Sequence, residues 1–376
     1  MSTSSHTELP ALARAGHAAH CKRCLSGLPG SQVEVDGARL ALSFYCIGSL
    51  DLLGVFFEKT SQFDREEWRE WIWEQHISGK YGTGFRPSPF MTTAGIAEGY
   101  EYTDYDTPHI IMTYTALLCL AILRDDFSRL DRTGLTTFIR ACQREDGSFS
   151  TVPGSGEFDL RTLYCAFAIS SMLDDWSGIN VPRAVEFIST CRTYEGGYGQ
   201  SPFCEAQGGT SYIAIASLHL APSSFLPNGP LTPAERELTV NWLLQNQAPS
   251  GGFKGRTNKE ADACYCFWCG AGLHILGAKE FVDKQALAGF LASCQFKYGG
   301  ISKAPGEHPD PYHTYLSLAA LAMYSPYTEG AEGNEATWQF ESLDPLLNAK
   351  ESTARWAREH IPARSIATTG HGVGVE

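Results

Sequence analysis

Residues 251–268 hold the densest set of chemically useful side chains in this sequence. Two cations, Arg256 and Lys259, stand three residues apart and are followed by Asp262 and then Cys264. A carboxylate and a thiolate are common zinc ligands. Arginine binds phosphate as a planar fork and lysine as a point charge. The stretch therefore predicts a metal beside an anion site, where a thiol, alcohol or water attacks a phosphorylated substrate.

The spacing of Asp262 and Cys264 predicts where they lie on the fold. Residues two apart on a helix do not share a face, so both can reach one ion only near a helix start. We therefore expect Asp262 to end a loop and Cys264 to lie in the first turn of the next helix. The same pair also fits an ordinary helix start, in which Asp262 caps the helix and Cys264 is a small buried side chain.

Composition narrows the class of protein. Of the 376 residues, 43% are hydrophobic and 12% aromatic, which predicts a large core and no extensive disorder. The net charge of −13 argues against nucleic acid as a partner. No apolar run approaches the ~20 residues that span a bilayer, so we do not expect an integral membrane protein. The polar start carries no signal segment, and the 12 cysteines predict reduced thiols in a cytoplasmic protein. The CxxC of Cys21 and Cys24 has no second CxxC and is interpreted as one face of a helix.

Internal repeats predict the fold. Glycine turns recur at Gly84, Gly147, Gly197, Gly252 and Gly300. Amphipathic helices are expected before them, at residues 65–76, 133–143, 182–191, 233–247 and 283–295. More uniformly apolar helices, typical of elements buried on both sides, are expected after them, at 109–123, 160–173, 210–220, 263–276 and 312–324.

A further pair of helices, at 18–28 and 38–53, brings the total to about six pairs. An open solenoid would need polar caps at both ends, and none is evident. We predict an all-α fold, a closed α/α barrel or toroid whose inner helices line a central apolar cavity. The expected division is a flexible segment 1–17, one catalytic domain 18–362 and a flexible tail 363–376.

The repeats also predict the position of the site. Arg161, Gln207, the Asp262–Cys264 pair and His313 all fall at the start of an expected inner helix. If the inner helices are parallel, these residues ring one mouth of the barrel, where helix N-termini favour an anion. Asp262, Cys264 and His313 then supply three ligands with one position open, as in catalytic zinc sites. A lone histidine at a helix start often only caps or packs, but its place in the repeat favours a ligand.

Several stretches together resemble a known family. They are the glycine repeats, GRTNKEADACYCFW (255–268), KAPGEHPDPYHTY (303–315), RLALSFYCIGSLDLL (39–53) and TPHIIMTYTALLCL (107–120). The sequence resembles the β subunits of protein prenyltransferases, above all the type I geranylgeranyl enzymes. The resemblance implies an α/α barrel paired with a separate α subunit. The implied activity transfers a C20 group from geranylgeranyl diphosphate to the cysteine of a C-terminal CaaX box, mostly CaaL, on proteins such as Rho-, Rac- and Rap-type GTPases.

The resemblance also implies roles for single residues. One zinc ion per β subunit would be bound by Asp262, Cys264 and His313, with Lys303 and Tyr265 beside the reaction. The implied contacts to geranylgeranyl diphosphate are Gln207, Gly208, Gly209, Arg256, Thr257, Asn258, Lys259, Tyr265, Cys266, Phe267, Trp268 and Ala41. Those implied for the peptide are Arg161, His109 and Tyr312.

Two positions predict the length of the isoprenoid and whether the reaction needs Mg²⁺. Ala41 stands where the farnesyl enzyme has a bulky Trp, which leaves room for a C20 chain. Lys303 stands where the farnesyl enzyme has an Asp that binds Mg²⁺, so we expect no Mg²⁺ requirement, although Lys303 also fits a solvated loop. Gln207, Tyr312 and Ile111 depart from the geranylgeranyl pattern and leave the strictness of CaaX selection open.

Other functions remain as alternatives. The near ones are the β subunits of farnesyltransferase and of Rab geranylgeranyltransferase. A terpene cyclase would share the barrel, but the sequence has no DxDD acid motif. A non-catalytic α-helical scaffold would bind partners without zinc. The sequence does not identify the α subunit or the substrate proteins, nor whether the chain is stable alone.

Overall fold

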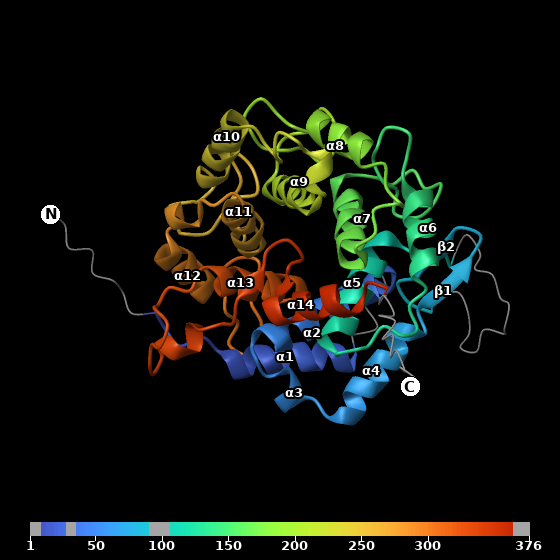
Figure 1. Ribbon diagram of the computed structural model, residues 1–376. Coiled ribbons are helices and arrows are strands. Elements are labelled where there is room, and N and C mark those ends of the chain that lie inside the picture. The colour runs from blue at the N-terminus through green and yellow to red at the C-terminus, as the bar shows by residue number, and fades with distance from the viewer. Residues whose placement is uncertain (1–8, 28–34, 90–105, 364–376) are drawn as a thin grey trace, which may run out of the picture.

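The helices form two concentric rings in the computed structural model, which describes residues 9–27, 35–89 and 106–363 (Figure 1). The inner ring consists of α2 (Arg39–Leu52), α5 (Ile110–Ile122), α7 (Leu160–Leu173), α9 (Gly208–Leu220), α11 (Ala263–Ile275) and α13 (Pro311–Met323). Each inner helix contacts the next, and α13 contacts α2, so the ring closes. The predicted closed α/α barrel is confirmed.

The outer ring supplies one amphipathic helix per repeat. It consists of α1 (Arg14–Ser26), α4 (Gln62–Trp73), α6 (Arg132–Cys142), α8 (Val181–Thr190), α10 (Pro233–Leu244) and α12 (Lys284–Ser293). Short helices connect these elements: α3 (Phe56–Lys59), η2 (Ser223–Phe225), η3 (Lys279–Phe281) and η4 (Glu335–Trp338). The domain start predicted at residue 18 falls inside α1. Residues 1–8 and 364–376, predicted to be flexible, lie outside the described residues.

Turn glycines explain the spacing of the repeats. Gly147 has φ +90° in the turn after α6, and a Cβ there would overlap the backbone carbonyl of Arg183 in the next outer helix, α8. Gly299 has φ +93°, and a Cβ there would overlap the backbone of Gly16 in α1. Only glycine tolerates both the backbone angle and the close approach. The Gly299 contact closes the outer ring from last repeat to first.

Two short hairpins accompany the helices. Strands β1 (His76–Gly79) and β2 (Gly82–Phe85) pair antiparallel, as do β3 (Leu343–Asp344) and β4 (Ala349–Lys350). The second hairpin leads directly into α14 (Glu351–His360), which crosses the ring in Figure 1. Arg124, just after α5, donates to the Ser352 carbonyl of α14, so α14 lies at the C-terminal ends of the inner helices. Within the described residues, no helix has the length and apolar character needed to cross a bilayer.

A ring of tyrosines holds the turn of the β3–β4 hairpin. Each is the fifth residue of an inner helix, buried, and donates its hydroxyl hydrogen to a turn carbonyl. The pairs are Tyr212 to Pro345 (2.8 Å), Tyr164 to Leu346 (2.9 Å), Tyr114 to Leu347 (2.7 Å) and Tyr315 to Asn348 (2.5 Å). Buried carbonyls need donors, so these tyrosines let four consecutive turn residues sit among the inner helices.

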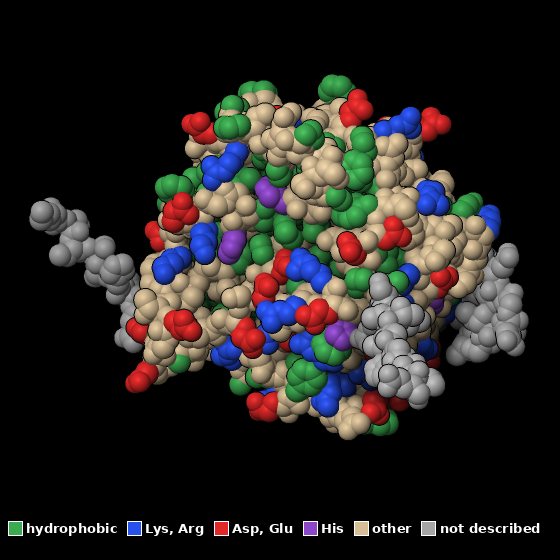
Figure 2. Space-filling model, viewed as in Figure 1, with side chains coloured by type: hydrophobic (Ala, Val, Ile, Leu, Met, Phe, Trp, Pro, Cys, Tyr) green, Lys and Arg blue, Asp and Glu red, His purple; other side chains and the backbone are tan. Residues whose placement is uncertain are grey.

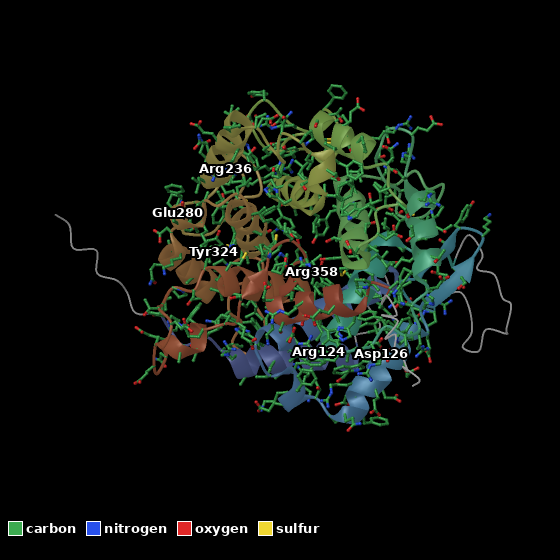
Figure 3. All side chains as sticks on the ribbon, viewed as in Figure 1. Arg124, Asp126, Arg236, Glu280, Tyr324 and Arg358 are labelled. Carbon is green, nitrogen blue, oxygen red and sulfur yellow. The ribbon has the colours of Figure 1, made fainter. Side chains whose placement is uncertain are left out.

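The face that carries α14 is the one shown in Figure 2. Apolar side chains gather near its middle, and charged side chains lie over α14 beside them. Arg358 of α14, labelled in Figure 3, pairs with Asp344 of the hairpin. Asp344 also accepts from the Leu346 and Leu347 amides at 2.8 and 3.0 Å, which fixes the turn. This end of the barrel is therefore filled by the chain itself.

Candidate metal and diphosphate site

Asp262, Cys264 and His313 converge at the N-terminal ends of α11 and α13. Their potential ligand atoms all lie within 4.8 Å of one another. Asp262 is the N-cap of α11, and its Oδ1 accepts from the Cys264 amide at 2.9 Å. His313 lies in the first turn of α13, with Nε2 3.4 Å from Asp262 Oδ1. The expected positions of Asp262 at the end of a loop and of Cys264 in the first turn of the next helix are confirmed. Asp262 therefore both caps α11 and belongs to the candidate metal-binding set.

Asp310 fixes the orientation of His313. It is the N-cap of α13, and its Oδ1 accepts from the His313 amide at 2.8 Å. Its Oδ2 lies 2.6 Å from His313 Nδ1. With a proton on Nδ1 donated to Asp310, Nε2 is the ring nitrogen that faces Asp262 and could bind a metal ion after losing its own proton. Histidines that bind metals are commonly held by a carboxylate in this way.

The electrostatics of the three ligands fit a bound cation. Burial raises the pKa of Cys264 to about 12, although its hydrogen bond with His313 opposes this. Burial also lowers the pKa of His313, but hydrogen bonds to Asp262 and Asp310 outweigh it and raise the pKa to about 11. Sulfur, nitrogen and oxygen donors in one small cluster suit zinc.

The predicted cationic loop lies beside this cluster. Residues Lys254 and Ala261 bridge to each other, so the loop between them leaves and returns at the start of α11. Lys259 is exposed, as are Thr257 and Asn258. Arg256 is half-exposed, and its Nη1 lies 2.8 Å from Glu205 Oε2. The two cations predicted to contact diphosphate are thus at the surface of the site.

Two glycines bring Tyr265 and α9 against this loop. The Gly208 amide, at the start of α9, donates to the Gly255 carbonyl at 2.7 Å. A Cβ on Gly255 would overlap the Tyr265 ring, and one on Gly208 would lie 3.2 Å from it. Gln207, the N-cap of α9, is half-buried and precedes these contacts, with Gly209 following in the first turn. Gln207, Gly208, Gly209 and Tyr265 are therefore brought together with the loop.

Lys303 and Tyr312 lie on the α13 side of the cluster. The Lys303 carbonyl accepts from the Ala263 amide at 2.9 Å, which fastens its exposed backbone to the first turn of α11. The Tyr312 hydroxyl accepts from Trp268 Nε1 at 3.1 Å. The Tyr312 ring also meets that of Tyr45 from α2, with centroids 5.3 Å apart. Trp268 and Tyr312 thus form a continuous aromatic wall beside the metal ligands.

Two of the residues predicted for the peptide, His109 and Arg161, lie at the same end of the barrel at the starts of α5 and α7, and the third, Tyr312, lies on α13. His109 is the N-cap of α5, and burial lowers its pKa to about 4, so the ring is neutral. Its Nδ1 is buried and has no hydrogen-bond partner among the residues that the structure describes. Ile111 follows in the first turn and is half-buried. Arg161, in the first turn of α7, pairs with Asp159, Nη2 to Oδ2 at 2.7 Å.

Three residues predicted for the isoprenoid have different environments. Ala41 is half-buried near the start of α2, one helical turn before Phe44 and Tyr45, whose rings both meet Tyr315 of α13. Phe267 is fully buried, and its ring meets Tyr212 at 5.1 Å. Cys266 is fully buried and interacts with Phe253 and Cys294. It lies two residues from Cys264 and so on a different side of α11.

Four further polar residues support the site and were not predicted. They are Asp310 on His313, Glu205 on Arg256, and Asp159 with Gln200, whose Nε2 donates to Asp159 at 2.6 Å. Asp310 had a signal in the sequence, because an Asp three residues before His313 at a helix start is an N-cap pattern. Asp159 had the same kind of signal, because it is the N-cap of α7 two residues before Arg161. Gln200 and Glu205 depend on contacts across the fold, with partners 41 and 51 residues away in the chain.

Comparisons with known proteins identify the family. The family model "Prenyltransferase alpha-alpha toroid domain" matches residues 12–349. Over 295 residues the chain is 37% identical to the geranylgeranyl transferase type-1 subunit beta of Arabidopsis thaliana, an alignment that covers 76% of this chain and 78% of that one. The chain belongs to the prenyltransferase family. The recognition made from the motifs is confirmed.

Further relatives of this prenyltransferase distinguish the type-1 geranylgeranyl subunits from the farnesyl subunits. It is 37% identical over 320 residues to the type-1 subunit beta of Dictyostelium discoideum, covering 80% and 88% of the two chains. It is 28% identical over 358 residues to the farnesyltransferase subunit beta of Schizosaccharomyces pombe, covering 89% and 85%. The solved geranylgeranyltransferase-I of Candida albicans, complexed with GGPP, matches with a TM-score of 0.80 at 26% identity, covering 93% and 99%. The predicted enzyme class and its leaning to the geranylgeranyl type are confirmed.

Proposed function

We propose that this chain is the catalytic β subunit of a zinc-dependent type I protein geranylgeranyltransferase. It transfers the C20 group of geranylgeranyl diphosphate to the cysteine thiol of C-terminal CaaX motifs, mostly CaaL. The observation that carries the proposal is the convergence of Asp262, Cys264 and His313 beside the Arg256–Lys259 loop. The alternatives of a farnesyl or Rab geranylgeranyl β subunit, or a scaffold without zinc, are outcomes of the test below.

Asp262, Cys264 and His313 are the residues that would hold one zinc ion. When bound, zinc supplies a Lewis acid that keeps the substrate thiol deprotonated at neutral pH. Asp310 keeps the proton on His313 Nδ1, so Nε2 is the donor atom. The partly buried position of the cluster, with side-chain exposures of 14% for both Asp262 and His313, limits competing water.

The cations and dipoles around the cluster would stabilise the leaving diphosphate. Arg256, Lys259, Tyr265, Gln207 and Lys303 are the donors, and the N-terminus of α9 points its partial positive charge to the same place. Fixed donors of this kind are each worth about 3 kcal/mol in the activation free energy. Glu205 now accepts from Arg256, so the diphosphate would compete with Glu205 for that guanidinium.

The apolar interior would hold the isoprenoid. Ala41 leaves space that an indole would fill, and Tyr312 of the neighbouring helix α13 lines the adjoining wall together with Trp268 of α11. Lys303 supplies a charge that would replace Mg²⁺ beside the diphosphate, so Mg²⁺ is not required. His109, Arg161 and Tyr312 are the residues assigned to the peptide, and Ile111 narrows the space next to His109.

The partners follow from the family. We infer a separate prenyltransferase α subunit that forms a heterodimer with this chain, and substrate proteins of the Rho, Rac and Rap type. All 12 cysteines are free thiols, as suits a reducing compartment such as the cytoplasm.

The test is co-purification with an α subunit, followed by assays with farnesyl and geranylgeranyl diphosphate against CaaL and CaaS peptides. We expect the geranylgeranyl–CaaL combination to be fastest and to proceed without added Mg²⁺. Faster farnesylation of CaaS peptides would identify a farnesyltransferase subunit. Transfer only to a Rab-type C-terminus would identify the Rab enzyme, and a purified complex that binds no zinc and transfers neither isoprenoid would favour a scaffold.

A further inference from the structure

Two thiols that the proposed reaction does not use face each other between α1 and α2. These helices pack side by side. Cys21 of α1 contacts Ser49 of α2, and Cys24 contacts Cys46. A step of three residues toward the C-terminus of α1 thus corresponds to a step of three residues toward the N-terminus of α2, as expected for antiparallel helices. This register sets Cys24 opposite Cys46. It gives the two cysteines of the CxxC motif, which the proposed reaction does not use, different partners on α2: Ser49 for Cys21 and Cys46 for Cys24.

The two thiols differ in access and in acidity. Cys24 is half-buried, whereas Cys46 is only 2% exposed. His20 Nε2 lies 3.9 Å from Cys24 Sγ, close enough to take the thiol proton. The contact with the Cys46 thiol lowers the pKa of Cys24 and raises the pKa of Cys46. Cys24 is therefore the more reactive of the two toward an external disulfide, because the thiolate is the nucleophile.

We propose that Cys24 and Cys46 form a reversible disulfide between α1 and α2, with glutathione disulfide as the oxidant. The Cys24 thiolate attacks one sulfur of glutathione disulfide, its proton passes to His20 or water, and one glutathione thiolate leaves. Cys46 then attacks Cys24 Sγ, the second glutathione leaves with the Cys46 proton, and the protein S–S bond forms. Two protein thiols are oxidised and one glutathione disulfide is reduced to two thiols.

The neighbouring cysteine does not compete for this bond. Cys21 is fully buried, and burial raises its pKa to about 12, so it stays a thiol. It also lies on the same helix as Cys24, opposite Ser49 and not opposite a thiol. Cys204 is exposed and far from α1 in sequence, so it reports reaction with glutathione at an ordinary surface thiol.

The bond would tie α1 to a helix of the site. Tyr45, beside Cys46 in α2, stacks its ring edge on Tyr312, which precedes the ligand His313. α1 in turn contacts the last repeat, where Gly300 donates to His17 Nδ1 at 3.0 Å. The disulfide would therefore lock the place where the first and last repeats join.

Trypsin makes the test unambiguous, because it separates the three cysteines. Cleavage after Lys22 and Arg23 leaves Cys21 in peptide 15–22, Cys24 in 24–39 and Cys46 in 40–59. The full chain, with its α subunit where one copurifies, is equilibrated in glutathione buffers, alkylated and digested without reductant. We expect peptides 24–39 and 40–59 to be linked as the dominant protein disulfide, and the link to disappear after reduction.

Variants and a denatured control sharpen the result. Cys21→Ser should retain the linked peptide, whereas Cys24→Ser and Cys46→Ser should lose it. Unfolding in urea before oxidation should remove the preference for this pair. The proposal is wrong if native wild-type protein carries glutathione on Cys24 while Cys46 stays alkylated. It is equally wrong if the dominant link joins peptide 15–22, or if no link forms while Cys204 is glutathionylated.

Discussion

The two ends of the barrel use polar groups in opposite ways. Beneath α14, the β3–β4 turn reaches into the barrel, and four buried tyrosines, each the fifth residue of its inner helix, donate to four consecutive backbone carbonyls of that turn. At the other end, Lys259 is exposed, His109 Nδ1 is buried without a partner among the described residues, and Asp262, Cys264 and His313 face one another. Polar groups that the chain satisfies itself stabilise the fold, whereas those it leaves open are available to ligands.

This contrast assigns stability to one end and catalysis to the other. Variants at the α14 end should change the free energy of unfolding and leave turnover alone. Variants at the metal end should do the reverse. Each prediction below tests one side of that division.

Lys259→Ala should have the largest effect on turnover. It removes a fixed cation from the leaving diphosphate, so kcat should fall by about 100- to 1,000-fold, with little change in peptide affinity. Steady-state kinetics with geranylgeranyl diphosphate would measure this. Lys284→Ala, an exposed lysine on α12, is the matched control and should leave kcat unchanged. Unchanged turnover in Lys259→Ala would remove this residue from the site.

Asp310→Asn should weaken the metal site without dismantling it. Loss of a carboxylate that orients a ligating histidine typically lowers metal affinity about 10- to 100-fold. Competition with a zinc chelator would measure the affinity. Glu307→Gln is a control on the same loop, with an exposed carboxylate. Equal zinc affinity in Asp310→Asn and wild type would mean that the hydrogen bond to His313 has no role in metal binding.

Ala41→Trp should change the preferred isoprenoid. The indole would fill the half-buried space at the start of α2, so the ratio of kcat/KM for the C20 donor to that for the C15 donor should fall by at least about tenfold. Ala38→Trp, one turn earlier, serves as a comparison. A ratio that stays constant in Ala41→Trp would show that the isoprenoid does not reach α2.

Tyr114→Phe should affect only stability. It leaves the buried Leu347 carbonyl without its donor, which costs about 1–3 kcal/mol in the free energy of unfolding. The ring itself should fit, because Phe267 occupies the corresponding position in α11. Denaturant unfolding would measure the loss, and Tyr298→Phe, 67% exposed, is the control. A large fall in turnover with normal stability would break the division between the two ends.

Much of this architecture could be predicted because it repeats. The glycine turns and the apolar helices recur along the chain. Their spacing alone therefore predicts the closed barrel and the residues at the starts of its inner helices. The predicted range 160–173 coincides with α7. Asp262 and Cys264 were placed by helix geometry, and His313 by its position in the repeat.

The features that could not be predicted from the sequence each occur only once, so no repeat reveals them. The β3–β4 hairpin has two-residue strands, too short for a period to show, and it is stable because tyrosines from four distant helices bind it. The Glu205–Arg256 pair joins residues 51 apart in the chain. Cys266 is grouped with the isoprenoid contacts by resemblance alone; it is fully buried near Phe253 and Cys294, and the assignment stays a prediction.

The central claim is that Asp262, Cys264 and His313 bind one metal ion, and metal analysis of the purified, reduced protein tests it most directly. We predict one zinc per chain in the wild type, and its loss together with activity in Asp262→Ala and His313→Ala, each still helical by circular dichroism. A protein that is active without stoichiometric zinc, or folded variants that keep both zinc and activity, would contradict the account.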